Sequence, residues 1–323
     1  MARTVLVTGV SRYVGGRVAE ALGADPSISR VLGVDVIAPA TAIDGVEFVR
    51  ADIRNPVIAK VLGEEAVDTV VHAGSIATSR QAGSRSTMKE INVIGTMQLL
   101  AACQRAPGVQ RLVVKSTGAV YGAGPRDPAK FSEDMDPRDA PTSGWAKDSV
   151  EVEGYVRGFA RRRPDVAVTT LRLANILGPR ITTGMTSYFR MRVVPTVLGF
   201  DPRLVFVHED DAVAALCASV HSPAHGVFNI AGDGNVVLSQ ALRRLGRASV
   251  AVPAFVLPTV GRTLGPSRHA DFTPEVVRLL TFGRGLDTTA MREVLGFSPA
   301  FTTEQALASL QEPGHDDTAA GEG

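Results

Sequence analysis

The chain has 323 residues, of which 45% are hydrophobic, and its 34 Lys and Arg side chains nearly balance 33 Asp and Glu side chains. This length and composition are typical of one large globular domain, or of two fused lobes with a sizeable core. A formal net charge of +1 provides no strong field toward polyanions, so we expect no nucleic-acid partner.

The termini and the cysteines indicate the compartment. The first residues, MARTVLVTGV, lack the apolar segment of a signal peptide, and no run of about eighteen apolar residues predicts a membrane span. Cys103 and Cys217 lie in apolar, alanine-rich stretches, where buried reduced thiols are expected rather than a disulfide. We therefore expect a cytoplasmic protein with no membrane partner, ending in a flexible tail over 311–323.

Strand and helix signals alternate through the first half of the chain. Apolar, β-branched runs predict strands, and longer segments with apolar residues at helical spacing predict helices. The expected strands cover 4–9, 30–36, 46–53, 67–74, 109–117 and 166–178, and the expected helices cover 15–25, 88–106 and 143–163. This alternation predicts an α/β fold, a doubly wound parallel sheet with helices on both faces.

The rhythm changes after Asn175, where Pro and Gly become frequent and the strands become short. Residues 203–220 again have the pattern of a strand followed by a helix, and 226–232 that of another strand. We therefore expect a dinucleotide-binding domain formed by 1–174 and about 203–231. A smaller substrate lobe, formed by 175–202 and about 232–310, is expected over the carboxyl edge of the sheet.

The turn after the first strand has the pattern of a phosphate-binding loop. In VLVTGVSRYVGG, Gly9 suits the tight turn and Gly15 suits close packing of the following helix on the strand. The middle glycine of such a loop is replaced by Arg12 or Tyr13, depending on the alignment. Arg12 could compensate by pairing with a phosphate oxygen. The alternative is an ordinary βα turn with glycines at its ends.

Two aspartates end strands where a dinucleotide's adenosine would lie. Asp35 ends the second strand, where a carboxylate accepts hydrogen bonds from ribose hydroxyls and repels a 2′-phosphate. The pattern therefore favours NAD over NADP. Asp52 ends the third strand, near the expected adenine, and is a weaker signal.

Several motifs together resemble the extended short-chain dehydrogenases/reductases, in particular their NAD-dependent sugar epimerase/dehydratase branch, which has a Rossmann domain. The resemblance extends from Thr4 to about Phe301. The segments that carry it, in chain order, are TGVSRYVG, VVHAGS, INVIGT, KSTGAVYG, LRLANILGPR, FVHEDDAVAAL and GVFNIAG.

The resemblance implies a set of site residues. Thr117 matches the Ser or Thr that orients the substrate, with Ser116 beside it, and Lys147 matches the lysine that holds the nicotinamide ribose. The matching positions for cofactor contacts are Gly9, Arg12, Tyr13, Val14, Gly15, Asp35, Asp52, Ile53, His72, Ala73, Gly74, Asn92 and Lys147. The helices at about 87–105 and 143–163 correspond to those that form family homodimers, so a homodimer is expected.

One departure from the family concerns the proton-transferring tyrosine, which stands four residues before the lysine. That position is Ser143 here, and none of the four tyrosines stands four residues before a lysine. Four residues along a helix place both side chains on one face. A serine hydroxyl is shorter than a phenol and far less acidic. The sequence therefore resembles a subgroup that lacks the catalytic tyrosine.

The substrate side is less defined. Asn175 matches the asparagine that contacts the diphosphate in nucleotide-sugar epimerases, and Arg180 and Tyr188 are further candidates. The arginine that such proteins often place four residues before the histidine of the FVHEDD segment is replaced by Leu204, with Arg203 adjacent. The histidines have no partners at metal-ligand spacing, so no metal site is expected.

Two classes of function remain open from the sequence. The first is an NAD-dependent epimerase, dehydratase or dehydrogenase that acts on a small-molecule sugar or another secondary alcohol. Its catalytic residues would be Thr117, which orients the substrate, Lys147, which holds the ribose, and Ser143, through which water transfers the proton unless the substrate itself supplies it. The second is an NAD-binding protein without redox activity, either a sensor or scaffold, or an isomerase or lyase on the same fold. The retained motifs favour the enzyme, and the missing glycine and tyrosine favour the alternative.

Overall fold

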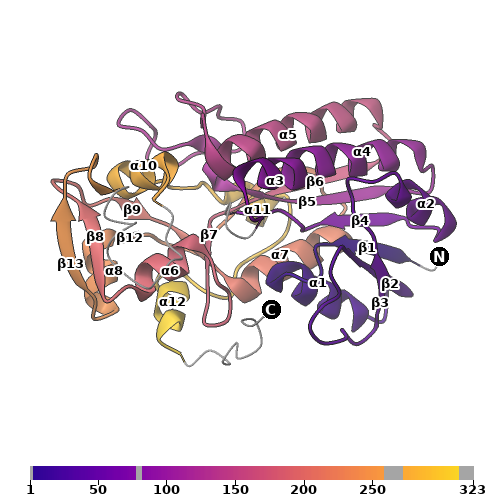
Figure 1. The fold of residues 1–323 in the computed structure, drawn as a ribbon, viewed down its shortest axis with the longest axis horizontal. Coiled ribbons are helices and arrows are strands. Elements are labelled where there is room, and N and C mark those ends of the chain that lie inside the picture. The colour runs from indigo at the N-terminus through magenta and orange to yellow at the C-terminus, as the bar shows by residue number, and fades with distance from the viewer. Residues whose placement is uncertain (1–2, 78–81, 258–271, 313–323) are drawn as a thin grey trace.

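The computed structural model describes residues 3–77, 82–257 and 272–312, and its centre is a parallel sheet of seven strands (Figure 1). The strand order is β11-β6-β5-β4-β1-β2-β3, with every pairing parallel. This is the doubly wound sheet that the alternating pattern predicted. The strands are β1 (Thr4–Thr8), β2 (Arg30–Asp35), β3 (Val46–Arg50), β4 (Thr69–His72), β5 (Arg111–Thr117), β6 (Ala167–Leu173) and β11 (Gly226–Ile230).

Successive strand residues face opposite layers of helices. Val5 and Val7 pack with the layer of α1 (Tyr13–Gly23) and α7 (Glu209–His221). Leu6, between them, packs with the layer of α2 (Val57–Glu64), α4 (Gly95–Arg105) and α5 (Gly144–Arg162). Because the side-chain period of a strand is two, one apolar strand supplies both cores.

Two predicted elements are divided in the structure. The helix expected over 88–106 consists of α3 (Arg85–Lys89), a π-helical turn at Glu90–Ile94 and α4. The strand expected over 166–178 ends at Leu173 and continues as β7 (Asn175–Leu177), which pairs with β10 (Phe206–His208) outside the main sheet. The carboxyl end of β6 therefore turns toward a second group of elements.

This second group has its own apolar core and lies beside the sheet, on the left of Figure 1. It pairs β8 (Val193–Val197) with β13 (Ala248–Val252) and β9 (Arg203–Leu204) with β12 (Val236–Val237). Its helices are α6 (Gly184–Arg190), α8 (Leu238–Arg244), α10 (Pro274–Phe282) and α12 (Thr303–Ala308), the last followed by a short turn, η3 (Ser309–Gln311). The exact division into two domains stays a prediction.

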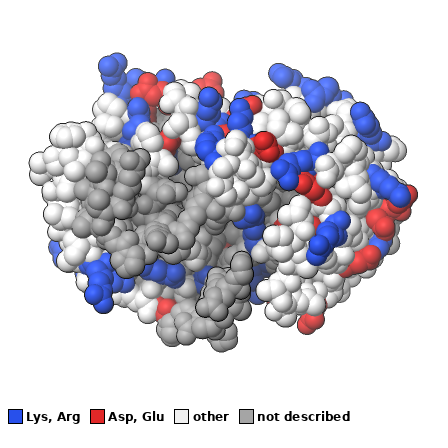
Figure 2. Space-filling view, in the orientation of Figure 1, with Lys and Arg blue, Asp and Glu red and all other residues white. Residues whose placement is uncertain are grey.

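Between α10 and α12 the chain returns to the sheet, where α11 (Thr289–Glu293) packs against β11. Both cysteines are free, and burial raises the pKa of Cys103 to about 12. Cationic and anionic side chains are interspersed over the visible face (Figure 2). Within the described ranges no helix combines the length and apolar character that a bilayer crossing needs.

Candidate active site

The loop after β1 lies against the loop after β4, where the strand order reverses. Gly9 has a φ of +78°, and a Cβ on it would lie 2.4 Å from the Cα of Gly74. A Cβ on Gly15 would lie 2.2 Å from the carbonyl oxygen of Gly9. Both glycines are therefore required by close backbone approach. A loop at this switch point, leading into a helix, has the form that holds a dinucleotide pyrophosphate.

Arg12 stands at the place of the missing glycine, and its backbone tolerates a side chain. It precedes α1 in an extended conformation, with φ −101° and ψ 151°. Since φ is negative, the turn itself does not demand glycine. Burial lowers the pKa of the Arg12 guanidinium, while Asp35 acts in the opposite direction.

Lys115 is a second cation near the loop, and no sequence motif marks it. It lies on β5, two residues from Val113, which packs in the core shared with α1 and α7. Burial and the positive charge of Arg12 lower the pKa of Lys115 to about 8. Neither cation forms an ion pair with another described residue. Two such cations beside the loop fit the phosphates of a dinucleotide.

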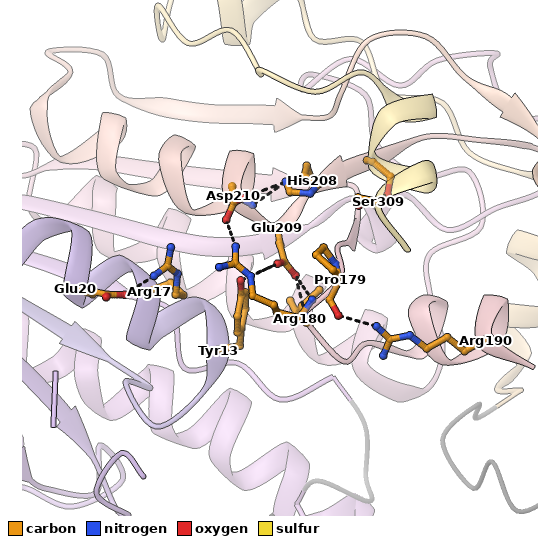
Figure 3. Close-up of polar contacts among 12 residues, drawn as sticks. Tyr13, Arg17, Glu20, Pro179, Arg180, Arg190, His208, Glu209, Asp210 and Ser309 are labelled. Carbon is orange, nitrogen blue, oxygen red and sulfur yellow. Dashed lines mark hydrogen bonds and ion pairs between the residues drawn. The ribbon is translucent and has the colours of Figure 1, made fainter. Parts of the chain in front are cut away.

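Tyr13 connects the loop with the segment after β7. Its hydroxyl donates to Oε1 of Glu209 at 2.9 Å, and Glu209 is fully buried (Figure 3). The same carboxylate accepts from Arg180 Nε at 2.8 Å and from the Ile181 amide at 2.7 Å. Arg180 also pairs with Asp210. Because these acidic groups occupy its guanidinium, the placement of Arg180 argues against the predicted substrate role.

The two aspartates differ in their surroundings. Asp35 ends β2, where its carboxylate accepts from the amide and hydroxyl of Ser11 and from the amide of Val36. It is only half-buried, as a group that contacts ribose must be. Asp52 accepts three hydrogen bonds from the guanidinium of Arg54, which lower the pKa of this carboxyl.

The residues after β4 form the wall next to Gly9. His72 is buried between the hydroxyls of Thr8 and Thr96, each 2.8 Å away, and burial lowers its pKa to about 4. Asn92, in the π-helical turn, accepts from the Ile76 amide and donates to the Ile76 carbonyl oxygen. The cofactor contacts predicted for His72 and Asn92 stay predictions, as do those predicted for Val14, Ile53, Ala73 and Gly74.

Thr117 and Ser116 face opposite sides of β5. Thr117 ends the strand, and its Oγ1 accepts from the Ala119 amide at 3.1 Å at the start of the turn η2 (Gly118–Tyr121). Ser116 donates at 2.6 Å to Glu153, which forms a buried ion pair with Arg172 on β6. Ser116 therefore belongs to the packing of α5 on the sheet, and this placement argues against its predicted substrate contact.

Ser143 immediately precedes α5 and contacts a carboxylate from the other lobe. Its Oγ donates at 2.5 Å to Oε1 of Glu275 on α10, and its amide donates to the same oxygen at 3.2 Å. The second oxygen, Oε2, is buried and has no hydrogen-bond partner among the described residues. The position of the expected tyrosine thus holds a serine hydroxyl bonded to a carboxylate. Glu275 lies 132 residues away in sequence, where no motif marks it.

Lys147 lies one turn into α5 and is exposed. Glu151, its potential i+4 partner, pairs instead with Lys89 at 3.2 Å. Lys147 forms no ion pair with another described residue, so its ammonium is available for the predicted ribose contact.

A cavity lies beyond η2, between the two lobes. Its lining includes Gly118, which follows Thr117, and the predicted substrate residue Asn175. It also includes Leu279 of α10 and Arg284, a residue that no motif identified. Tyr188 is not part of it. Its side chain is buried among Phe189 and Phe272, with its hydroxyl on the Pro195 carbonyl oxygen, which argues against a substrate role.

His208, which ends β10 and caps the N-terminus of α7, is held by contacts within the fold. His208 stacks on Phe301, with ring centroids 3.8 Å apart, and accepts from the Asp210 amide. Among the described residues, no three His, Cys, Asp or Glu side chains gather as metal ligands would.

Comparison with known proteins agrees with this architecture. An uncharacterized protein of Mycobacterium tuberculosis is 46% identical over 309 residues, covering 94% of this chain and 82% of that protein. The UDP-glucose 4-epimerase of Mycolicibacterium smegmatis is 29% identical over 329 residues, covering 95% and 97% of the two chains.

Solved structures share the fold at lower identity. A UDP-glucose 4-epimerase from Thermotoga maritima, crystallised with UDP-glucose, superposes with a TM-score of 0.74 at 21% identity, over 96% of this chain and 98% of that one. MoeE5 in complex with UDP-glucuronic acid and NAD gives 0.73 at 23% identity, over 95% and 97%. The profile of the NAD dependent epimerase/dehydratase family matches residues 5–231. The chain therefore belongs to the NAD dependent epimerase/dehydratase family, and NAD is its cofactor.

Proposed function

We propose that the protein is an oxidoreductase of the epimerase or dehydratase type that acts on a sugar-type substrate or another secondary alcohol, with proton transfer through Ser143 and Glu275. The hydrogen bond between these two side chains, at the position of the missing tyrosine, carries the proposal. The relatives named as UDP-glucose 4-epimerases support a sugar-type substrate.

Oxidation of a secondary alcohol removes a proton from its oxygen and a hydride from its carbon. NAD, when bound, supplies the hydride acceptor. We infer that the substrate hydroxyl gives its proton to Ser143 Oγ, while the Ser143 proton passes to Oε1 of Glu275. The carboxylate then holds the proton that a phenol holds elsewhere in the family, and the reverse transfer completes an epimerisation. Thr117 orients the substrate oxygen, and Lys147 holds the ribose.

The non-redox alternative has its own support. None of the four tyrosine hydroxyls replaces the missing group, because Tyr13, Tyr121 and Tyr188 bond to Glu209, Asn229 and Pro195 and Tyr155 lies on an exposed part of α5. An NAD-binding sensor or a non-redox isomerase would need no such group. The alternatives differ in whether NAD is reduced by any alcohol substrate.

The test compares the protein with its Glu275→Gln variant. NAD is titrated first, and reduction of the nicotinamide is then followed by absorbance with UDP-glucose and other sugar substrates. We expect Glu275→Gln to slow reduction by about 100-fold or more, since removal of a general base has effects of this size. Its NAD affinity should stay within about twofold of the original, because Glu275 lies on the substrate lobe.

Glu293→Gln is the matched control, because Glu293 is exposed on α11. Equal reduction rates in the two variants would contradict the role of Glu275. Tight NAD binding by the original protein, without reduction by any alcohol, would favour the non-redox alternative instead.

We also propose a homodimer formed through α4 and α5. These helices pack side by side, and Ile94 and Tyr155 remain exposed on the surface that they share with the π-helical turn. Light scattering of the protein and of a Tyr155→Asp variant tests the assembly, because a monomeric mass for both would exclude it.

A further inference from the structure

Lys115 lies on β5, and its side chain is half-buried. Because alternate residues of a strand share a face, it lies on the same side of β5 as Thr117, where that strand ends. Burial and the positive charge of Arg12 lower the pKa of Lys115, and the charge of Lys115 adds to the effect of burial on the pKa of His72, at the end of β4. The ammonium of Lys115 is therefore within electrostatic range of the loop after β1 and of the end of β4.

Lys115 has no negative partner in the described part of the chain. Its ammonium forms no hydrogen bond or ion pair there, and the charged group that acts on its pKa is Arg12, a like charge. The carboxylate of Asp35 offsets part of the Arg12 charge, but no described carboxylate does so for Lys115. Holding an ammonium partly out of water costs free energy unless a bound anion supplies the opposite charge.

The two cations differ in their places along the expected path of the cofactor. A dinucleotide crosses a doubly wound sheet at its switch point, with the pyrophosphate at the N-terminus of the helix that follows the first strand. Asp35, at the end of β2, suits the adenosine ribose, so the nicotinamide half extends in the other direction, over β4 and β5. Arg12 belongs to the loop itself, whereas Lys115 lies on the nicotinamide side of that loop.

The two redox states of NAD differ in charge at the nicotinamide. Uptake of a hydride, a proton with two electrons, cancels the positive charge of the ring, so NADH is one charge more negative than NAD. A cation beside the phosphates attracts both forms equally, because the phosphate charges do not change. A cation on the nicotinamide side also repels the oxidised ring and therefore distinguishes the two forms.

We propose that Lys115 makes the protein bind NADH more tightly than NAD, while Arg12 strengthens the binding of both forms to the same extent. By linkage, the factor that separates the two affinities also favours hydride transfer onto bound NAD from the carbon of an alcohol substrate. The inference requires only that NAD is the cofactor, because added NADH binds without turnover.

Calorimetric titration at pH 7 with NAD and with NADH, after removal of any co-purified nucleotide, tests the proposal. The original protein should bind NADH about tenfold or more tightly than NAD. Lys115→Met should reduce this ratio about fivefold or more, by lowering the affinity for NADH more than that for NAD. Arg12→Ala should weaken both nucleotides by the same factor and leave the ratio unchanged.

Lys115→Arg keeps the charge, so its ratio should stay within about twofold of the original. Lys130→Met is the matched control, because it removes an exposed lysine and should change neither affinity. Lys115→Gln serves if Lys115→Met does not fold. Equal losses of NAD and NADH affinity on neutralising Lys115 would assign its ammonium to the phosphates alone and overturn the proposal. Equal affinities for the two forms in the original protein would overturn it as well.

The outcome is separable from that of the proposed function. A protein that reduces NAD with a sugar substrate, but whose preference for NADH ignores Lys115, contradicts only this inference. A protein whose preference for NADH depends on Lys115, but which never reduces NAD with any alcohol, contradicts only the proposed redox function.

Discussion

Tyr13, at the start of α1, donates its hydroxyl to Glu209, at the start of α7, across 2.9 Å. Glu209 in turn holds the backbone amides of Arg180 and Ile181, which follow β7. A Cβ on Gly178 would lie 2.2 Å from Oε2 of Glu209, so the segment packs tightly on this carboxylate. The cofactor loop and the entry to the smaller lobe therefore share one buried anion.

This relationship predicts the effect of Tyr13→Phe. The variant removes one hydrogen bond to a buried carboxylate and keeps the ring, so the free energy of unfolding should fall by about 1–2 kcal/mol. Urea unfolding measures the change. Thr41→Val is the control, because it removes a hydroxyl from an exposed side chain. The same loss in both variants would show that the bond to Glu209 contributes nothing specific.

Asp35 should set the preference between NAD and NADP. Asp35→Ala removes an acceptor for the ribose hydroxyls, so NAD affinity should fall by about tenfold or more. NADP affinity should fall less or rise, because the carboxylate that repels its 2′-phosphate is gone. Calorimetric titration of both nucleotides measures the difference.

The hydrogen bonds from Ser11 to Asp35 require a separate control. Ser11→Ala loosens the loop without removing the Asp35 carboxylate, and it should lower the affinities for NAD and NADP equally. Equal losses of NAD and NADP in Asp35→Ala would contradict the ribose assignment.

Arg12 should assist cofactor binding. Arg12→Ala removes a cation beside the phosphate loop, and we expect NAD affinity to fall about tenfold, and the fall to shrink as salt is added. Arg17→Ala is the control on the same helix, because Arg17 pairs with Glu20 at the surface. If Arg12→Ala binds NAD as tightly as the original protein, the cation contributes nothing to binding, and if it binds NAD more tightly, the side chain obstructs the position of the missing glycine.

Lys115 should make stability depend on pH. Its pKa in the folded protein is about 8, below the 10.5 of a free lysine, so the folded state binds this proton less tightly than the unfolded state. The cost is complete below pH 8 and disappears as the pH rises to about 10.5. Lys115→Met should therefore raise the free energy of unfolding by about 1–3 kcal/mol at neutral pH, allowing for solvent screening.

Urea unfolding at pH 7 and at about pH 9.5 tests this pH dependence, and the gain should shrink at the higher pH. Lys130→Met is the control, because Lys130 is exposed on a loop. A gain of the same size at both values would mean that packing of the methionine, rather than ionisation of Lys115, causes it.

The sequence predicts the features that depend on neighbours in the chain. Runs such as TVLVTG predict the strands because apolar, β-branched residues suit a strand buried on both faces. Gly9 and Gly15 are recognisable because the positive φ of Gly9 and the close approach of Gly15 to the Gly9 carbonyl oxygen both arise within the turn. The π-helical turn cannot be recognised from the sequence, because it accompanies the contact of Asn92 with Ile76, sixteen residues earlier.

The sequence does not predict the features that depend on contacts between residues far apart in the chain. Glu275 and Arg284 lie in a stretch where elements are short and no motif repeats, and only the packing of the smaller lobe brings them to Ser143 and Leu204. The contacts of Arg180 with Glu209 and of Tyr188 with Pro195 are missed too, because these partners cannot be identified from spacing.

Ser143→Tyr tests whether the site still accepts the usual proton donor. In the single variant a phenol would meet the carboxylate of Glu275, which lies against the Ser143 hydroxyl, so we expect little gain. In Ser143→Tyr combined with Glu275→Ala, the phenol gains room and stands four residues before Lys147, directly before the first residue of α5. This double variant should reduce NAD at a rate at least about tenfold higher than that of Glu275→Ala alone.

Ser143→Phe combined with Glu275→Ala is the control, because it supplies the ring without the hydroxyl, and its rate should not rise. If the tyrosine and phenylalanine variants are equally slow while both bind NAD, the substrate oxygen does not lie within reach of position 143, and the role proposed for Ser143 and Glu275 is wrong.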